Sequence, residues 1–184
     1  GGAGGNAVNN MISSQLEGIT LGHTDRRNDH EIELAMVIGR TAKNVAYDDA
    51  LDIVAGYAIG LDITVRGVED RSLRKSLDSY AVLGPWMTTA DEIDDPDDLD
   101  FRLTVNGEVR QDSNTKNLIF DCRKLIEYAS RFYTLYPGDI LMTGTLLPGD
   151  VILTGTPEGV GPIEPGDRVV CQMDVIGKME LDVR

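Results

Sequence analysis

Two carboxylates in this chain are spaced so that both could bind one hard cation. Glu31 and Glu33 are two residues apart in the run 29–39. Side chains two residues apart on a β-strand point to the same face, so the pair can reach a single ion. Oxygen donors of this kind suit Mg²⁺, Mn²⁺ or Ca²⁺. The alternative is that both acids form only the solvent-facing side of an amphipathic strand whose other side is apolar, with Ile32, Leu34, Met36 and Ile38.

A third carboxylate follows in a second alternating run, 57–65. Its apolar face is large, whereas its other face combines one acid, Asp62, with three small residues: Ala58, Gly60 and Thr64. A glycine beside an acid inside a strand indicates close approach by a ligand or by another backbone. Asp62 would supply the third oxygen ligand that a two-glutamate site lacks.

Length and composition indicate the kind of protein in which these strands lie. The chain has 184 residues, 17 basic and 31 acidic, with a formal charge of −14. This length suits one substantial core. The acidic balance argues against a nucleic-acid partner, and no apolar run has the length of a membrane span. Cys122 and Cys171 have no CxxC partner, so we expect two reduced thiols, no zinc site and a cytoplasmic protein.

The remaining patterns predict an α+β, strand-dominated domain over 29–184. Residues 1–28, which begin with a glycine-rich stretch, are expected to be a flexible or incomplete N-terminal segment. Asn106-Gly107 predicts a type I′ hairpin between 101–105 and 108–111. A helix is expected over 116–130, capped by Asn114 or Thr115, and a β-hairpin over 168–183. The turn at 84–86 is expected to bury its tryptophan.

A direct repeat of eleven residues lies near the end of the chain. Residues 134–145 are echoed by 145–156 with conservative differences only. Each copy has the pattern of a turn followed by a short strand. We interpret the repeat as a local duplication, which leaves the register of this strand open.

Several motifs, in order along residues 29–184, resemble the fumarylacetoacetate hydrolase family. The first is Glu31-x-Glu33-Leu-Ala-x-Val-Ile-Gly, followed by Ala55-Gly56-Tyr57 and Asp62. The others are Lys75-Ser76-x-Asp78, Leu83-Gly84-Pro85-Trp86, Val105-Asn106-Gly107-Glu108, Gln111-x-x-Asn114-Thr115 and Thr154-Gly155-Thr156-Pro157-Glu158-Gly159-Val160-Gly161. The resemblance implies a mixed β-roll with a metal at an open mouth of the sheets, and a homodimer.

The resemblance also implies roles for individual residues. Glu31, Glu33 and Asp62 match the ligands of a divalent metal, usually Mg²⁺ or Mn²⁺. Lys75 matches a catalytic lysine that stabilises developing negative charge. Gln111, Gly155 and Thr156 match substrate-binding positions. Arg66 opens a basic stretch, 66–75, which is expected to hold an anionic substrate near the metal, the alternative being a solvated, ion-paired loop or helix.

The acid–base group has no clear counterpart. Several family members use a histidine, often with a glutamate, from a lid segment that precedes the metal-binding strand. The histidines here are His23 and His30, and each is weighed against a surface or packing role. The lid is either absent from the protein or outside the sequence given.

Three functions follow in order. The first is a divalent-metal-dependent hydrolase of small, anionic 2-oxo or 1,3-diketo acids, such as acylpyruvates, that cleaves a C–C bond through a metal-stabilised enolate. Decarboxylation or isomerisation of hydroxymuconate-type diacids is the variant of this function. The second is a non-catalytic metal-binding relative without a lid base. The third is a structural β domain, which would require the three carboxylates to point apart.

Overall fold

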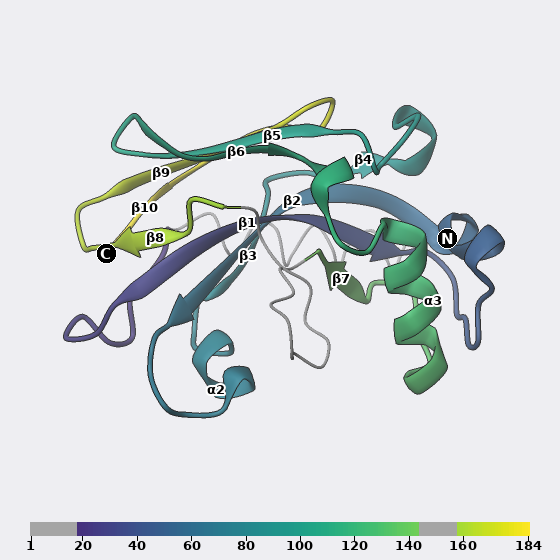
Figure 1. Cartoon of the computed structure of the whole chain (residues 1–184), viewed down its shortest axis with the longest axis horizontal. Coiled ribbons are helices and arrows are strands. Elements are labelled where there is room, and N and C mark those ends of the chain that lie inside the picture. Colours follow the sequence, from purple (N-terminus) through teal and green to yellow (C-terminus); the bar gives the residue numbers. More distant parts are fainter. Residues whose placement is uncertain (1–17, 144–157) are drawn as a thin grey trace.

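The chain folds into two stacked β-sheets with helices at the ends (Figure 1). The computed structural model describes residues 18–143 and 158–184. The larger sheet has the strand order β3-β2-β1-β7, with β4 also paired to β2 and β8 to β1. The smaller sheet has the order β10-β9-β5-β6. This arrangement confirms the strand-dominated α+β class.

The larger sheet is organised around a long antiparallel pair. These strands are β1 (Asn28–Ile38) and β2 (Val54–Val65), and they pair from Asn28 opposite Val65 to Ile38 opposite Val54. Every residue of β1 is buried, so the strand is covered on both faces. The shorter strands beside them are β3 (Ala81–Leu83), β4 (Thr88–Thr89), β7 (Ile140–Met142) and β8 (Gly161–Ile163).

The smaller sheet consists of two hairpins. Its strands are β5 (Asp100–Val105), β6 (Glu108–Asn114), β9 (Arg168–Met173) and β10 (Gly177–Asp182). Asn106 and Gly107 both have positive φ, 53° and 82°, as a type I′ turn requires. Both predicted hairpins are therefore confirmed, with strand ends shifted by a few residues.

The helices differ in part from the prediction. The α-helices are α2 (Arg71–Lys75) and α3 (Cys122–Phe132), and the 3-10 helices are η1 (Tyr47–Ile53), η2 (Ala90–Glu92) and η3 (Thr115–Asn117). Asn114 does cap a helical turn, but that turn is η3 alone. The predicted helix 116–130 is wrong in its start, because Leu118 is extended and Asp121 caps α3 through Lys124 N. None of the helices in 18–143 and 158–184 combines the length and apolar character that a membrane crossing requires.

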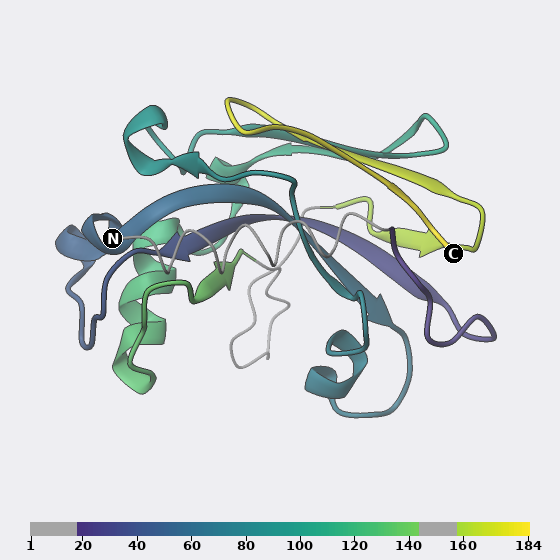
Figure 2. The same ribbon diagram turned by 180° about the vertical axis from the view of Figure 1, so that it is seen from behind.

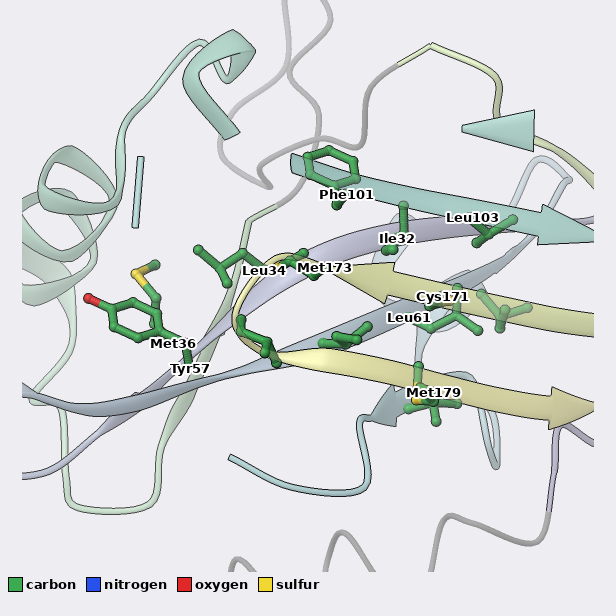
Figure 3. Packing of buried hydrophobic residues seen from close by; sticks show 14 of the residues in the cluster. Ile32, Leu34, Met36, Tyr57, Leu61, Phe101, Leu103, Cys171, Met173 and Met179 are labelled. Atoms are coloured by element: carbon green, nitrogen blue, oxygen red, sulfur yellow. The ribbon is translucent and has the colours of Figure 1, made fainter. Parts of the chain in front are cut away.

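The core lies between the two sheets. Figure 3 shows Ile32 and Leu34 of β1 directed toward Phe101 of β5 and Met173 of β9. Cys122 and Cys171 are free, buried thiols, as expected. Burying this interface is the main stabilising contribution that the fold provides. It also decides which face of β1 and β2 is left for other roles.

The opposite face of the larger sheet looks away from the smaller sheet. In both views α2 and α3 lie on this side, at opposite ends of the sheet (Figures 1 and 2). Because side chains alternate along a strand, the residues beside Ile32 and Leu34 in the sequence point toward this side. The predicted carboxylates therefore lie on the face between α2 and α3.

Two local features depart from simple expectation. The prediction that Trp86 is buried is wrong: the residue is 49% exposed, and its indole N–H donates to the Ile176 carbonyl. The ring lies against Gly177, which has no side chain to displace it. In the segment before β1, Ile19 is fully buried and pairs with Val183, and Leu21 is also buried, so this part of the segment packs against the domain.

One side chain of the smaller sheet supports β1 directly. Among the described strands, β8 pairs with Asn28–His30 and β7 with Ala35–Val37, so Ile32 lies between them. Ile32 N donates to Gln111 Oε1 at 3.1 Å, and His30 Nδ1 lies 3.1 Å from the same oxygen. Gln111 is completely buried. Its amide thus links β6 to the backbone between the two glutamates.

We expect Gln111→Met to destabilise the protein by about 1–3 kcal/mol, because it removes an acceptor from two buried donors while keeping a similar volume. Gln172→Met, on an exposed position of β9, is the matched control and should change stability by less than about 0.5 kcal/mol. Urea unfolding followed by circular dichroism measures both. Equal stability of the two variants would show that the Gln111 bonds contribute nothing.

Candidate metal centre

The β1–β2 register brings the predicted carboxylates together. Glu31 lies opposite Asp62, and Glu33 lies opposite Gly60, on the face directed away from the smaller sheet. One carboxylate oxygen from each of the three acids lies within 4.8 Å of the other two. In the described residues this is the sole group of three or more acidic, histidine or cysteine side chains close enough to hold a metal ion.

The three acids are shielded from solvent. Glu31 and Glu33 are 8% and 4% exposed, and the Asp62 side chain is 16% exposed. Burial raises the pKa of Glu33 well above its usual value, and the nearby Asp62 charge raises it further. Burial likewise raises the pKa of Asp62, to about 6, although Lys75 opposes the shift. Like charges held together in a desolvated site favour a counter-cation.

This donor set fits a hard divalent ion. Three carboxylates supply oxygen-only ligands and more negative charge than the single ammonium among them offsets. Gly60, beside Glu33, carries no side chain, and a Cβ there would lie 2.6 Å from Met142 Cε. The residues next along this face are small or apolar and form a separate cluster: Ala35, Ala58, Leu83, Ile140 and Met142. The carboxylates thus lie beside an apolar surface.

Lys75 reaches the carboxylates from α2. Its Nζ lies 2.9 Å from Glu31 Oε2 and also contacts Asp62 Oδ2. Burial lowers the pKa of Lys75, but the Asp62 and Glu31 charges outweigh that effect and the net shift is upward. Lys75 therefore stays protonated as an ammonium between two acids.

The loop before α2 is fixed by Arg26. Its guanidinium donates to both carboxylate oxygens of Glu69, at 3.0 and 2.8 Å, and to the Arg66 carbonyl. A Cβ on Gly67 would lie 1.7 Å from Arg26 Nη2, so glycine is needed for this approach. Asp70 then caps α2 through Ser72 N at 2.8 Å. Together these contacts direct the end of α2 toward the metal centre.

Arg66 lies at the edge of the same group. Its Nε donates to Asp29 Oδ2 at 2.6 Å and its Nη2 to Glu31 Oε1 at 3.4 Å. The alternating pattern that identified Glu31 and Glu33 extends back to Asp29, but the sequence analysis did not use it. Asp29 is 1% exposed and also pairs with Arg27. The buried Asp29 was therefore a detectable member of the site that was missed.

Other predicted site residues do not join this group. His30 lies on the opposite face of β1, toward the smaller sheet, where it meets Gln111 of β6. Burial lowers the pKa of His30. His23, which is half-exposed, lies 3.9 Å from Asp25. Gly155 and Thr156 are outside the described residues.

The described part of the first copy of the repeat, 134–143, lies beside β1. Its strand is β7, which pairs with Ala35–Val37. Thr143 extends this contact: its backbone N donates to Leu34 O at 2.8 Å and its Oγ1 accepts from Leu34 N at 2.9 Å. The threonine assignment made from sequence used the second copy, and it stays a prediction.

Comparison with known proteins places this geometry in context. The family model "Fumarylacetoacetate (FAA) hydrolase C-terminal" matches residues 6–147 and 145–184. The two matched ranges overlap at 145–147, within the repeat. The maleylpyruvate hydrolase of Aquipseudomonas alcaligenes is 53% identical over 177 residues, which are 96% of this chain. The chain spans 58% of that enzyme's length.

Solved structures agree on the fold. Maleylpyruvate hydrolase from Sphingobium sp. SYK-6, in complex with manganese (II) ion and pyruvate, has a TM-score of 0.79 and 44% identity, covering 91% of this chain and 58% of that one. Fumarylpyruvate hydrolase from Pseudomonas aeruginosa, in complex with Mn²⁺ and pyruvate, has a TM-score of 0.78 and 31% identity, covering 90% and 70%. Because the family model matches nearly the whole of this chain, the chain belongs to the fumarylacetoacetate hydrolase family.

Proposed function

We propose that this chain is the catalytic part of a divalent-metal-dependent hydrolase of acylpyruvates. The observation that carries the proposal is the buried group of Glu31, Glu33 and Asp62 on one sheet face. The reaction adds water to an acylpyruvate and releases a carboxylic acid and pyruvate. Relatives with this activity were solved with manganese and pyruvate, which supports both the ion and the oxo-acid product.

Each residue has a distinct part in this proposal. Glu31, Glu33 and Asp62 would hold Mn²⁺ or Mg²⁺, which when bound supplies Lewis-acid stabilisation of negative charge on an oxo acid. Lys75 adds a fixed positive charge beside the same carboxylates, where it can offset charge that develops as the C–C bond breaks. Arg66 provides a second cationic group at the edge of the site. The apolar cluster around Met142 borders the carboxylates at the end of the face away from Arg66.

The location and assembly are also part of the proposal. We place the protein in the cytoplasm, because both of its cysteines are free thiols. We expect a homodimer, since the two sheets have edge strands to cover and exposed aromatic residues occur at the end of α3 and just after it, at Phe132, Tyr133 and Tyr136.

Asp62→Ala should abolish tight Mn²⁺ binding, because it removes one of three oxygen ligands. Calorimetric titration of the purified protein measures the affinity. Asp112→Ala, which removes an exposed acid on the smaller sheet, is the control and should bind as the wild type does. Unchanged affinity in Asp62→Ala would refute the site.

Lys75→Met should lower kcat on an accepted acylpyruvate by roughly 10²-fold, the effect of losing one electrostatic stabiliser of the transition state. Mn²⁺ affinity should not fall, because Lys75 is not a ligand and its ion pairs compete with the cation. Steady-state kinetics separate the possibilities. A raised KM with normal kcat would assign Lys75 to substrate binding, and no change in either would remove it from the site.

Acylpyruvate turnover with Mn²⁺ or Mg²⁺ tests the activity itself. Release of pyruvate, coupled to its reduction, should follow addition of acetylpyruvate or fumarylpyruvate and disappear in Glu33→Gln. Turnover of oxaloacetate or a hydroxymuconate-type diacid instead would indicate decarboxylation or isomerisation. Metal binding without turnover of any of these would indicate a non-catalytic relative.

Sedimentation velocity at micromolar concentration should give a species of twice the 20.0 kDa chain mass. The expectation follows from the sheet edges and the exposed aromatic side chains. A single species at the monomer mass across the concentration range would contradict it.

A further inference from the structure

The turn between β5 and β6 contains a chemically labile pair, Asn106 followed by Gly107. The backbone nitrogen after an asparagine can attack the side-chain amide carbon, and a glycine in that place offers no side chain to hinder the attack. Both residues are exposed, and a Cβ on Gly107 would meet no atom within 4 Å. Within residues 18–143 and 158–184, the Gly107 N–H donates no hydrogen bond. The attacking nitrogen is therefore accessible.

The side-chain amide of Asn106, in contrast, is held by the neighbouring hairpin. Asn106 Nδ2 donates to Asp167 Oδ1 at 2.7 Å, and Arg168 N donates to Asn106 Oδ1 at 2.9 Å. Asp167 is itself fixed, because Glu164 N donates to its Oδ2 at 2.9 Å. The two bonds to the amide form a clamp, the Asn106 clamp, between the turn and the start of β9. The amide carbon must leave this clamp before it can reach the Gly107 nitrogen.

We propose that Asn106 is a site of spontaneous deamidation whose rate is set by the Asn106 clamp. The Gly107 nitrogen bonds to Asn106 Cγ, the Cγ–Nδ2 bond breaks, and ammonia leaves with the Gly107 N–H proton, which closes a five-membered succinimide ring. Water then opens the ring at one of its two carbonyl carbons. One opening gives aspartate, and the other gives isoaspartate, in which the main chain runs through the former side-chain carboxyl. Water is the one co-reactant that the sequence of steps consumes.

Either product weakens the contact with β9. An aspartate at position 106 has no side-chain N–H to donate and places its carboxylate against that of Asp167, so an attractive contact becomes a repulsive one. Isoaspartate also lengthens the main chain by one carbon, inside a turn whose two central residues have φ values of 53° and 82°. The formal charge of the chain changes from −14 to −15, because one carboxylate is added.

The strand after the turn depends on the turn for its pairing. Among the described strands, β6 is the last in the order β10-β9-β5-β6, so it pairs with β5 alone. The turn sets the register of this hairpin, in which Val105 lies opposite Glu108. β6 also carries Gln111, whose Oε1 accepts from Ile32 N of β1. Conversion of Asn106 should therefore loosen β6 and weaken its support of the larger sheet.

A second asparagine in the chain is a matched internal control. Asn44 is also exposed and has a φ of 52°, close to that of Asn106. The residue after it is Val45, which is β-branched and whose N donates to Ser130 Oγ at 2.9 Å. Asn44 thus shares the backbone conformation and the exposure of Asn106 but lacks an accessible attacking nitrogen. It should stay unconverted under conditions in which Asn106 reacts.

The experiment incubates the purified protein at mildly alkaline pH and follows conversion of each asparagine by peptide mass spectrometry. In the folded wild type, Asn106 should convert at least roughly tenfold more slowly than in the same protein unfolded in urea, because the clamp must break first. Asp167→Ala should accelerate conversion in the folded protein toward the unfolded rate. Asp167→Asn keeps an acceptor oxygen for Asn106 Nδ2 and should retain most of the protection.

The consequence for β6 is measured on the product. Converted protein, separated from fresh protein by ion exchange through its extra charge, should exchange amide hydrogens faster over 108–114. Asn106→Asp should reproduce part of that increase.

Equal conversion rates in folded and unfolded wild type would overturn control by the clamp, and this comparison stands even if Asp167→Ala does not fold. An unchanged rate in folded Asp167→Ala would overturn it as well. Absence of conversion at Asn106 in urea would refute the site itself, and unchanged exchange over 108–114 in converted protein would refute its effect on β6.

Discussion

The pairing register of β1 and β2 is the constraint on which the rest of the site depends. It sets Glu31 opposite Asp62 and Glu33 opposite Gly60, so the three acids lie close together while the glycine allows Met142 to pack beside them. A slip of one residue would turn every site residue into the core and every core residue outward. Because the core face of both strands is filled by the smaller sheet, that slip would expose a large apolar surface. Core packing therefore fixes the geometry of the polar face.

Holding the acids together has an electrostatic cost that the surrounding residues offset only in part. The raised pKa values of Glu33 and Asp62 reflect burial first. Lys75 reduces the cost, and its approach depends on Arg26, Gly67 and the Asp70 cap rather than on α2 itself, which is only five residues long. A loop fixed by side-chain contacts can adjust locally. This suits a lysine that lies against the acids of a candidate cation site.

Two short strands pair with β1 along the edge that faces away from β2. The first copy pairs with β1 as β7, while β8, which follows the second copy, pairs with Asn28–His30. Between their pairing positions, Ile32 N is supported by Gln111 from the other sheet. Among residues 18–143 and 158–184, the backbone of the candidate metal site is therefore supported on this side by two short strands and by one side chain from the other sheet.

The sequence by itself determined the local patterns. Period-two alternation identified both central strands and their faces, Asn106-Gly107 specified its hairpin, and the family motifs indicated the carboxylate group. These follow from spacing along one segment, where geometry is fixed by the backbone. Sequence could not place α3, because the Asp121 cap and the extended Leu118 compete with a good helical pattern.

Only the tertiary structure decided which residues meet across segments. It brought Gln111 of β6 against His30 and Ile32 in the core, exposed Trp86, and joined Arg27, Asp29 and Arg66 into one group. Each of these outcomes depends on pairing between residues far apart in the chain or on the direction of a long side chain. Neither is encoded in local spacing, because a strand pattern gives the face on which a side chain lies but not the partner that it meets there.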